Sequence, residues 1–436
     1  MTSQLETQET DVTVGLSAQE VLDLEGRYLC NGATETSLTF DHARGSTVVD
    51  ADGREYIDLA CGVLITNLGH AHPRVTQAVA NVVGRSPASY HHPTELRATL
   101  CERLARALPG DLQRSVFFSA GAEAIDASVR LARQVTGKRE VISFRGAFHG
   151  RTYLALSVSG KRGLRIGAGD GVPGVIHFPY PNRDDDVNQQ EWRAEADHIL
   201  ASVSGGDVAA ILVEPYQGSG GVIVPPEWFL PELSALAKSL GALLIVDEVQ
   251  SGFGRTGSLF AIEQTGVVPD IVVFGKAMGN GVPLGALTTT DAVSALARDG
   301  SFSSTFGGNV MACAAAHAVL DAFAFDGVLE KGRALSKTVS AELAQWPSTI
   351  PVVERVRIWG LAIGVQLRGG AKSAVVASDV VRRAREAGVV LIPPIGVFAN
   401  VLRIAPALTM DDDLALKGLG IVRGILQDVS ETVTSG

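Results

Sequence analysis

The chain has 436 residues, a formal net charge of −10 and 46% hydrophobic residues. This length and apolar content predict two or three domains with full hydrophobic cores. The sequence has no cluster of Lys and Arg, which argues against nucleic-acid binding, and no apolar stretch of about 18 residues, which argues against a membrane span. Its first residues lack a basic segment and an apolar run, so we expect no signal peptide and a cytoplasmic location.

The cysteines and histidines show no pattern of a metal or disulfide site. The four cysteines are widely separated and form no CxxC pair, so we expect free thiols in a reducing compartment. They are Cys30, Cys61, Cys101 and Cys313. No histidines have the spacing of ligands on one helix face, and we therefore predict no metal site.

Strand and helix patterns alternate through most of the chain. Residues 45–62 alternate around an Asp-Gly turn and predict a β-hairpin. Helices are predicted at about 73–85, 94–108, 121–135, 189–204 and 226–240. Strands are predicted for the apolar runs RSVFFS, EVISF, GVIHF, AAILVEP, LLIVD, IVVFG and GALTT. This order indicates an α/β fold with a mostly parallel sheet covered by helices.

The pattern changes after Asn309. A long Ala-rich helix and a helix at 328–345 precede strands near 352–358, 361–367, 388–392 and 400–405, and a last helix follows TMDDD. We predict three parts: an N-terminal segment, 1–59, that packs with the small domain, a large domain, 60–325, and a small α+β domain, 326–436.

Two charged residues follow apolar runs that predict neighbouring buried strands. Asp247 ends LLIVD, and Lys276 comes just after IVVFG. Ligands of open α/β sheets bind beyond the carboxyl ends of the strands, so both side chains are expected in one site. An amine that can form a Schiff base and a carboxylate that can keep a pyridine nitrogen protonated suggest pyridoxal 5′-phosphate (PLP).

The segments around these residues, DEVQSGFGRTG and FGKAMGNGVPLGA, resemble the class III aminotransferases of the fold type I PLP enzymes. The resemblance extends from about Leu38 to Leu426. It implies that the large domain binds PLP and that the enzyme moves an amino group from an amine or amino acid to a keto acid such as 2-oxoglutarate or pyruvate. The site residues are most similar to those of the 4-aminobutyrate aminotransferases, so the donor could be an ω-amino acid such as 4-aminobutyrate.

The resemblance also implies which residues contact the cofactor. Gly121 and Ala122 begin a helix after a strand, where free backbone N–H groups can hold the phosphate. Many relatives have Ser or Thr where this chain has Ala122, so one hydroxyl contact is missing. Phe148 is implied to stack on the pyridine ring. The other implied cofactor residues are His149, Glu214, Gln250 and Thr305, with Thr305 reaching the phosphate of the neighbouring subunit and so implying a homodimer.

Substrate-binding residues are implied at four positions. Arg151 and Arg403 match arginines that bind substrate carboxylates, and Val63 is implied to form a pocket wall. In enzymes that act on ω-amino groups, a glutamate often occupies position 219 and pairs with the arginine that Arg403 matches. This chain has Ser219, so we expect Arg403 to stay unpaired and to favour carboxylate-bearing substrates in both half-reactions.

Alternative functions remain open at this point. Amino acid racemases or epimerases, an aminomutase and PLP-dependent lyases share these motifs, and a catalytically silent protein is a further alternative. Gly252, Gly254 and Gly257 form a GxGxxG pattern, but DEVQS separates them from the strand and no long helix follows. We therefore expect no nicotinamide cofactor.

Overall fold

The largest unit of the fold is a seven-stranded sheet with strand order β4-β10-β9-β8-β7-β5-β6. The structure is a computed structural model that describes residues 15–30, 38–85, 89–90, 92–167 and 169–434. Strands from β9 to β6 are parallel to their neighbours, whereas β10 is antiparallel to both β9 and β4, so the predicted mostly parallel sheet is confirmed. The strands are β4 (Leu112–Phe118), β5 (Glu140–Phe144), β6 (Val175–Phe178), β7 (Val208–Val213), β8 (Leu243–Asp247), β9 (Ile271–Phe274) and β10 (Gly285–Thr290).

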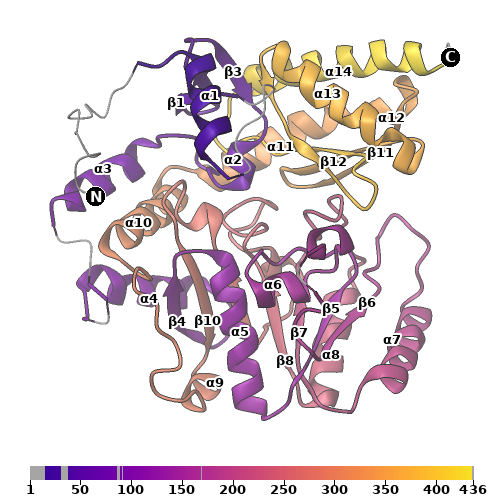
Figure 1. Cartoon of the computed structure of the whole chain (residues 1–436). Coiled ribbons are helices and arrows are strands. Elements are labelled where there is room, and N and C mark those ends of the chain that lie inside the picture. Colours follow the sequence, from indigo (N-terminus) through magenta and orange to yellow (C-terminus); the bar gives the residue numbers. More distant parts are fainter. Residues whose placement is uncertain (1–14, 31–37, 86–88, 91, 168, 435–436) are drawn as a thin grey trace.

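Helices cover both faces of this sheet, which explains the continuous apolar runs in the sequence. Every residue of β7 is buried. Leu212 packs in one cluster with α5 (Gly121–Thr136), whereas Val213 packs in another with α8 (Phe229–Leu240). Because successive strand residues point to opposite faces, the two helices lie on opposite sides of the sheet (Figure 1).

Two four-stranded sheets form the remainder, in the orders β1-β2-β3-β13 and β11-β12-β15-β14. The predicted hairpin is confirmed, because β2 and β3 pair antiparallel. N-terminal strand β3 also pairs in parallel with C-terminal strand β13. Figure 1 shows β3 and the C-terminal helix α13 (Ala374–Glu386) above the large sheet. The boundaries at residues 59/60 and 325/326 stay predictions. The strands are β1 (Phe40–Arg44), β2 (Thr47–Asp50), β3 (Glu55–Asp58), β11 (Val353–Trp359), β12 (Ala362–Leu367), β13 (Val389–Val390), β14 (Ile392–Ile395) and β15 (Val401–Ile404).

One predicted strand is wrong. Residues 388–392 do not form a single strand, because Val389 pairs with Ile57 in one sheet whereas Ile392 pairs with Arg403 in another. Leu391 therefore lies where the chain crosses between two sheets. The local apolar pattern is the same on both sides of this crossing, so only the distant pairing partners distinguish the two strands.

The predicted helices are confirmed to within a few residues at each end. They are α3 (Pro73–Val83), α4 (Glu95–Ala107), α5, α7 (Gln189–Val203), α8, α10 (Val310–Phe325), α11 (Val328–Ala344) and α14 (Asp412–Thr434). Further helices are α1 (Ala18–Tyr28), α6 (Tyr153–Val158), α9 (Asp291–Ala295), α12 (Trp346–Thr349) and α13 (Ala374–Glu386). No single helix in the described ranges is long and apolar enough to cross a membrane; only the bent pair Val310–Phe325 and Val328–Thr349 passes by length and composition. All four cysteines are free thiols.

The first turn of α5 is placed by close contact with the ends of two strands. A Cβ added to Gly285 in β10 would lie 2.3 Å from the Ala120 carbonyl oxygen, and one added to Gly275 would lie 3.4 Å from the Gly121 nitrogen. Only glycine allows such an approach at position 285. The start of α5 is thereby held directly beside the strand ends.

We expect Gly285→Ala to lower the free energy of unfolding by about 1–3 kcal/mol, because the added methyl group overpacks this contact. Gly424→Ala is the matched control, since no atom of the described residues, apart from its own helix backbone and chain neighbours, lies within 4 Å of its added Cβ in α14. Alanine there should raise stability by up to about 1 kcal/mol. Urea denaturation measures both values; equal effects of the two changes would contradict the close-contact argument.

Candidate active site

Three charged residues meet at the carboxyl edge of the large sheet. Asp247 ends β8, Lys276 follows β9 after one glycine, and Glu214 follows β7 directly. These strands are parallel neighbours, so their carboxyl ends lie side by side. The charges of Asp247 and Glu214 both act on the Lys276 amine, which places the three groups in one site.

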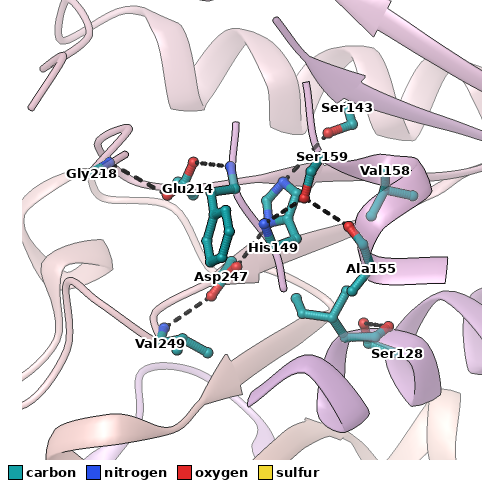
Figure 2. Close-up of polar contacts among 12 residues, drawn as sticks. Ser128, Ser143, His149, Ala155, Val158, Ser159, Glu214, Gly218, Asp247 and Val249 are labelled. Carbon is teal, nitrogen blue, oxygen red and sulfur yellow. Dashed lines mark hydrogen bonds and ion pairs between the residues drawn. The ribbon is translucent and has the colours of Figure 1, made fainter. Parts of the chain in front are cut away.

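Asp247 is held by a buried histidine (Figure 2). His149 Nδ1 lies 2.8 Å from Asp247 Oδ2, and the other carboxylate oxygen accepts the Val249 backbone N–H at 3.0 Å. The ring nitrogen facing a carboxylate carries the proton, so His149 Nε2 is left to accept from the Ser143 hydroxyl at 3.4 Å. His149 therefore fixes the orientation of the Asp247 carboxylate.

Glu214 is a buried carboxylate beside this pair. Its Oε2 accepts the backbone N–H of Phe148 at 3.2 Å, and its Oε1 accepts that of Gly218 at 3.4 Å (Figure 2). Burial raises the pKa of Glu214 to about 7. The Glu214 side chain thus holds the backbone of Phe148 and fixes the loop that carries the aromatic ring.

Lys276 has an unusual backbone and an unusual amine. Its φ is 45°, in the left-handed region that residues other than glycine rarely adopt. Burial, followed by the positive charge of Arg403, lowers the pKa of Lys276 to about 8. A lysine of this kind is partly neutral near physiological pH and can act as a nucleophile.

The start of α5 offers an anion site near these groups. Within the described part of the chain, no side chain caps the first amides of α5, since N-cap residue Ala120 has no side-chain acceptor. An added Cβ on Gly121 would lie 2.8 Å from the Val249 side chain, so the helix start adjoins the segment after Asp247. Gln250 lies in the same segment, and its Oε1 is buried with no partner among the described residues.

A positively charged region lies beside Lys276. Arg403 on β15 is 5% exposed, and its Nε is buried without a hydrogen-bond partner in the described part of the chain. Burial lowers its pKa to about 10. Lys161 Nζ donates to the Ser219 carbonyl oxygen at 3.0 Å, and burial and then the charge of Arg403 lower the Lys161 pKa.

Val63 lies in a left-handed turn. Cys61, Gly62, Val63 and Leu64, labelled α2, have φ values of 51°, 55°, 65° and 61°. This conformation costs about 1–2 kcal/mol for each L-residue. The Val63 side chain is 45% exposed, whereas Cys61 and Leu64 are buried.

Two predicted residues differ from this buried group in their exposure. Arg151 and Thr305 are both exposed. Thr305 is followed by Phe306, which is 64% exposed. The roles of all these residues stay predictions.

Sequence reasoning missed Lys161 and Ser143. Lys161 follows no apolar run, and Ser143 is one small residue inside a strand, so neither has a local signal. Only the contacts with Ser219 and His149 reveal them.

Comparison with known proteins agrees with this geometry. Residues 28–426 match the class-III aminotransferase family. The chain belongs to the class III aminotransferases. Its cofactor is therefore PLP, and its reaction is the transfer of an amino group between an amino donor and a keto acid. The relatives give no support to the racemase, epimerase or lyase alternatives.

The relatives differ in the amine they act on. The chain is 35% identical over 400 residues to 5-aminovalerate aminotransferase of Pseudomonas putida, covering 89% of this chain and 93% of the relative. It is 36% identical over 409 residues to 4-aminobutyrate aminotransferase of Mycobacterium tuberculosis, covering 89% and 90%. It is 33% identical over 415 residues to acetylornithine aminotransferase of Methanothermobacter thermautotrophicus, covering 95% and 100%.

Solved structures share the fold over almost their full length. Ornithine aminotransferase of Toxoplasma gondii, which holds PLP at partial occupancy in its active site, has a TM-score of 0.85 and 27% identity, covering 95% of this chain and 96% of that one. An (S)-enantioselective omega-transaminase of Thermomicrobium roseum has a TM-score of 0.86 and 28% identity, covering 94% and 99%. The fold type I architecture is confirmed.

The lowered pKa of Lys276 predicts the pH dependence of cofactor uptake. Only the neutral amine reacts with the PLP aldehyde, so the uptake rate of cofactor-free protein should rise with pH to a plateau with a midpoint near 8. Arg403→Met removes a positive charge and should move the midpoint upward. Stopped-flow absorbance from pH 6 to 10 measures both; an unshifted midpoint in the variant would contradict the coupling.

Proposed function

We propose that this aminotransferase uses substrates with a carboxylate in both half-reactions, and that Arg403 binds the carboxylate attached to the reacting carbon, as in the keto acid. The supporting observation is the buried Arg403 guanidinium, whose Nε has no partner among the described residues. Lys161 adds a second positive charge beside it. Position 219 is a serine, so no carboxylate at this position can mask the arginine. A substrate carboxylate would supply the missing negative charge.

The residues present fit PLP, and we assign them roles accordingly. When bound, PLP supplies an aldehyde and a ring that stabilises negative charge at the substrate carbon. Lys276 would hold the cofactor as a Schiff base and later move a proton at that carbon. Asp247, oriented by His149, would keep the pyridine nitrogen protonated. Assigned to the cofactor besides these are Gly121 and Ala122 for the phosphate, Phe148 for the ring face, Gln250 for the phenolic oxygen and Glu214 for ordering the site.

The donor we propose is an aliphatic amine that carries a carboxylate, such as 4-aminobutyrate or 5-aminovalerate. Two of the relatives act on these ω-amino acids. Arg151 is an exposed arginine that could receive the distal carboxylate, and Val63 would provide an apolar wall for the carbon chain. The acceptor would be a keto acid bound through Arg403.

We also propose a homodimer with shared active sites. Exposed Thr305 and Phe306 adjoin a hollow whose lining includes Phe117, Ser304 and Gly307. An exposed aromatic side chain beside a hollow suits a protein interface. Thr305 would reach the phosphate bound by the partner subunit. Free cysteines fit a reducing compartment, which supports a cytoplasmic location.

We expect Arg403→Ala to raise the KM for the keto acid by the equivalent of about 2–4 kcal/mol, because a buried charged contact is lost. Single-turnover spectra with each donor, without keto acid, measure the other half-reaction as a shift of the cofactor absorbance to shorter wavelength. An unchanged acceptor KM would refute this role of Arg403.

Ser219→Glu tests the role of the Arg403 charge by adding a carboxylate at position 219. The new carboxylate can pair with Arg403, so transfer from 2-aminobutyrate should become about tenfold less efficient relative to 4-aminobutyrate, whose reacting carbon carries no carboxylate. Ser219→Gln is the matched control, since it has a similar size and no charge. Equal effects of Glu and Gln would show that size, and not charge, matters at this position.

Mixed dimers test the role of Thr305. Lys276→Ala and Thr305→Val chains should each be impaired as homodimers, whereas a mixed dimer combines an intact lysine and an intact partner threonine in one of its two sites. We therefore expect activity to recover in part on mixing. Absence of recovery in verified mixed dimers would indicate that each site is built within one chain.

A further inference from the structure

The left-handed turn at Cys61–Leu64 is strained at a position where packing does not require it. Burial in the core accounts for Cys61 and Leu64, which are 1% and 2% exposed. It does not account for Val63, a β-branched residue that is 45% exposed and has φ 65° and ψ 48°. Residues other than glycine keep a left-handed backbone conformation only when the surrounding structure imposes it, and they are concentrated at functional sites.

Three polar contacts of Asp58 hold the start of the turn. Asp58 Oδ1 accepts the backbone N–H groups of Ala60 at 2.7 Å and Cys61 at 3.0 Å. Asp58 Oδ2 lies 2.8 Å from His70 Nε2. The carboxylate therefore joins the start of the turn to the segment that follows it.

A fully buried arginine holds the other side of the turn. Arg255 is 0% exposed and donates to Asn67 Oδ1 at 2.5 Å and to Cys61 Sγ at 3.5 Å. Its second terminal nitrogen donates to the carbonyl oxygens of Leu361 at 3.0 Å and Pro406 at 2.8 Å. All of these acceptors are uncharged, so the guanidinium joins the turn to two C-terminal segments without an ion pair.

The same chain segments carry the cofactor residues. Arg255 follows Asp247 and Gln250 in DEVQSGFGRTG, and Asn280 follows Lys276 in GKAMGNG. Asn280 accepts the Leu68 N–H at 3.0 Å and donates to the Gly69 carbonyl oxygen at 3.0 Å. The position of the turn is therefore set relative to Asp247 and Lys276.

We propose that Arg255 is a positioning residue that, through Asn67 and Cys61, holds this strained turn and so places the Val63 side chain against the carbon chain of the amino donor. This inference rests on the proposed function, in which Val63 forms a wall of the substrate site. It assigns donor chain-length preference to a buried arginine that acts through its contacts with the turn.

The test compares kcat/KM for 4-aminobutyrate and 5-aminovalerate, which differ by one methylene. Arg255→Lys keeps the charge but loses the fork, and it should change the ratio of the two values by about tenfold, the usual scale for a misplaced methylene contact. Retained cofactor absorbance shows that the Lys276 site is intact. Arg103→Lys is the matched control, because Arg103 binds Asp321 and the His317 carbonyl, away from the turn; its ratio should equal that of the wild type.

A second variant tests the strain directly. Asparagine tolerates the left-handed region, so Val63→Asn should raise the melting temperature by about 2 °C while changing the donor ratio. In the Val63→Asn background, Arg255→Lys should change the ratio no further, since it acts through that side chain. Asn67→Ser replaces Arg255→Lys if the latter does not fold.

The outcomes separate this inference from the function on which it rests. A wild-type protein that transfers no amino group from either donor overturns the proposed donor class. An active wild type whose donor ratio is unaffected by Arg255→Lys, or independent additive effects of the two changes, overturns the inference. A lower melting temperature of Val63→Asn also overturns it, because the side chain would then be held by packing.

Discussion

The parallel pairing of β7, β8 and β9 is the constraint on which the site depends. Each strand ends at the same edge of the sheet, and each brings a charged residue to that edge: Asp247 ends β8, Glu214 follows β7, and Lys276 follows β9 after one glycine. Glu214, Asp247 and Lys276 thereby meet although about thirty residues separate each from the next along the chain. The helices on both faces exclude water from the strands, so these charges lie at the border of a dry interior. Burial there accounts for the shifted pKa values of Glu214 and Lys276.

Charge balance within the site explains its chemistry. Lys276, Lys161 and Arg403 bring positive charge to one region, and Glu214 is the buried carboxylate that acts on all three. Because the pKa of Glu214 is about 7, its negative charge is incomplete near neutral pH. The site therefore favours anionic ligands, in agreement with keto acids as substrates of the family.

Strain and support occur together around this site. Val63 and Lys276 both adopt left-handed backbone conformations, and each lies in a segment held by buried polar contacts. Arg255 and Asn280 provide those contacts from the two motifs that also carry Asp247 and Lys276. One network can thus hold the cofactor residues and the substrate wall in a fixed relation, because buried hydrogen bonds allow little movement.

The sequence by itself determined the elements, the mostly parallel sheet and the candidates Asp247 and Lys276, because apolar runs and the residues that end them are local features. It also determined the family, since the motifs around these two residues are specific. Only the tertiary structure decided that residues 388–392 divide between two sheets, that His149 orients Asp247 and that the Lys161 amine lies close enough to Arg403 to be affected by its charge. Only it, too, revealed the left-handed turn at Val63 and the role of Arg255 in holding it. These features depend on contacts between residues far apart in the chain, and no local pattern of hydrophobicity or spacing encodes which distant partner a side chain meets.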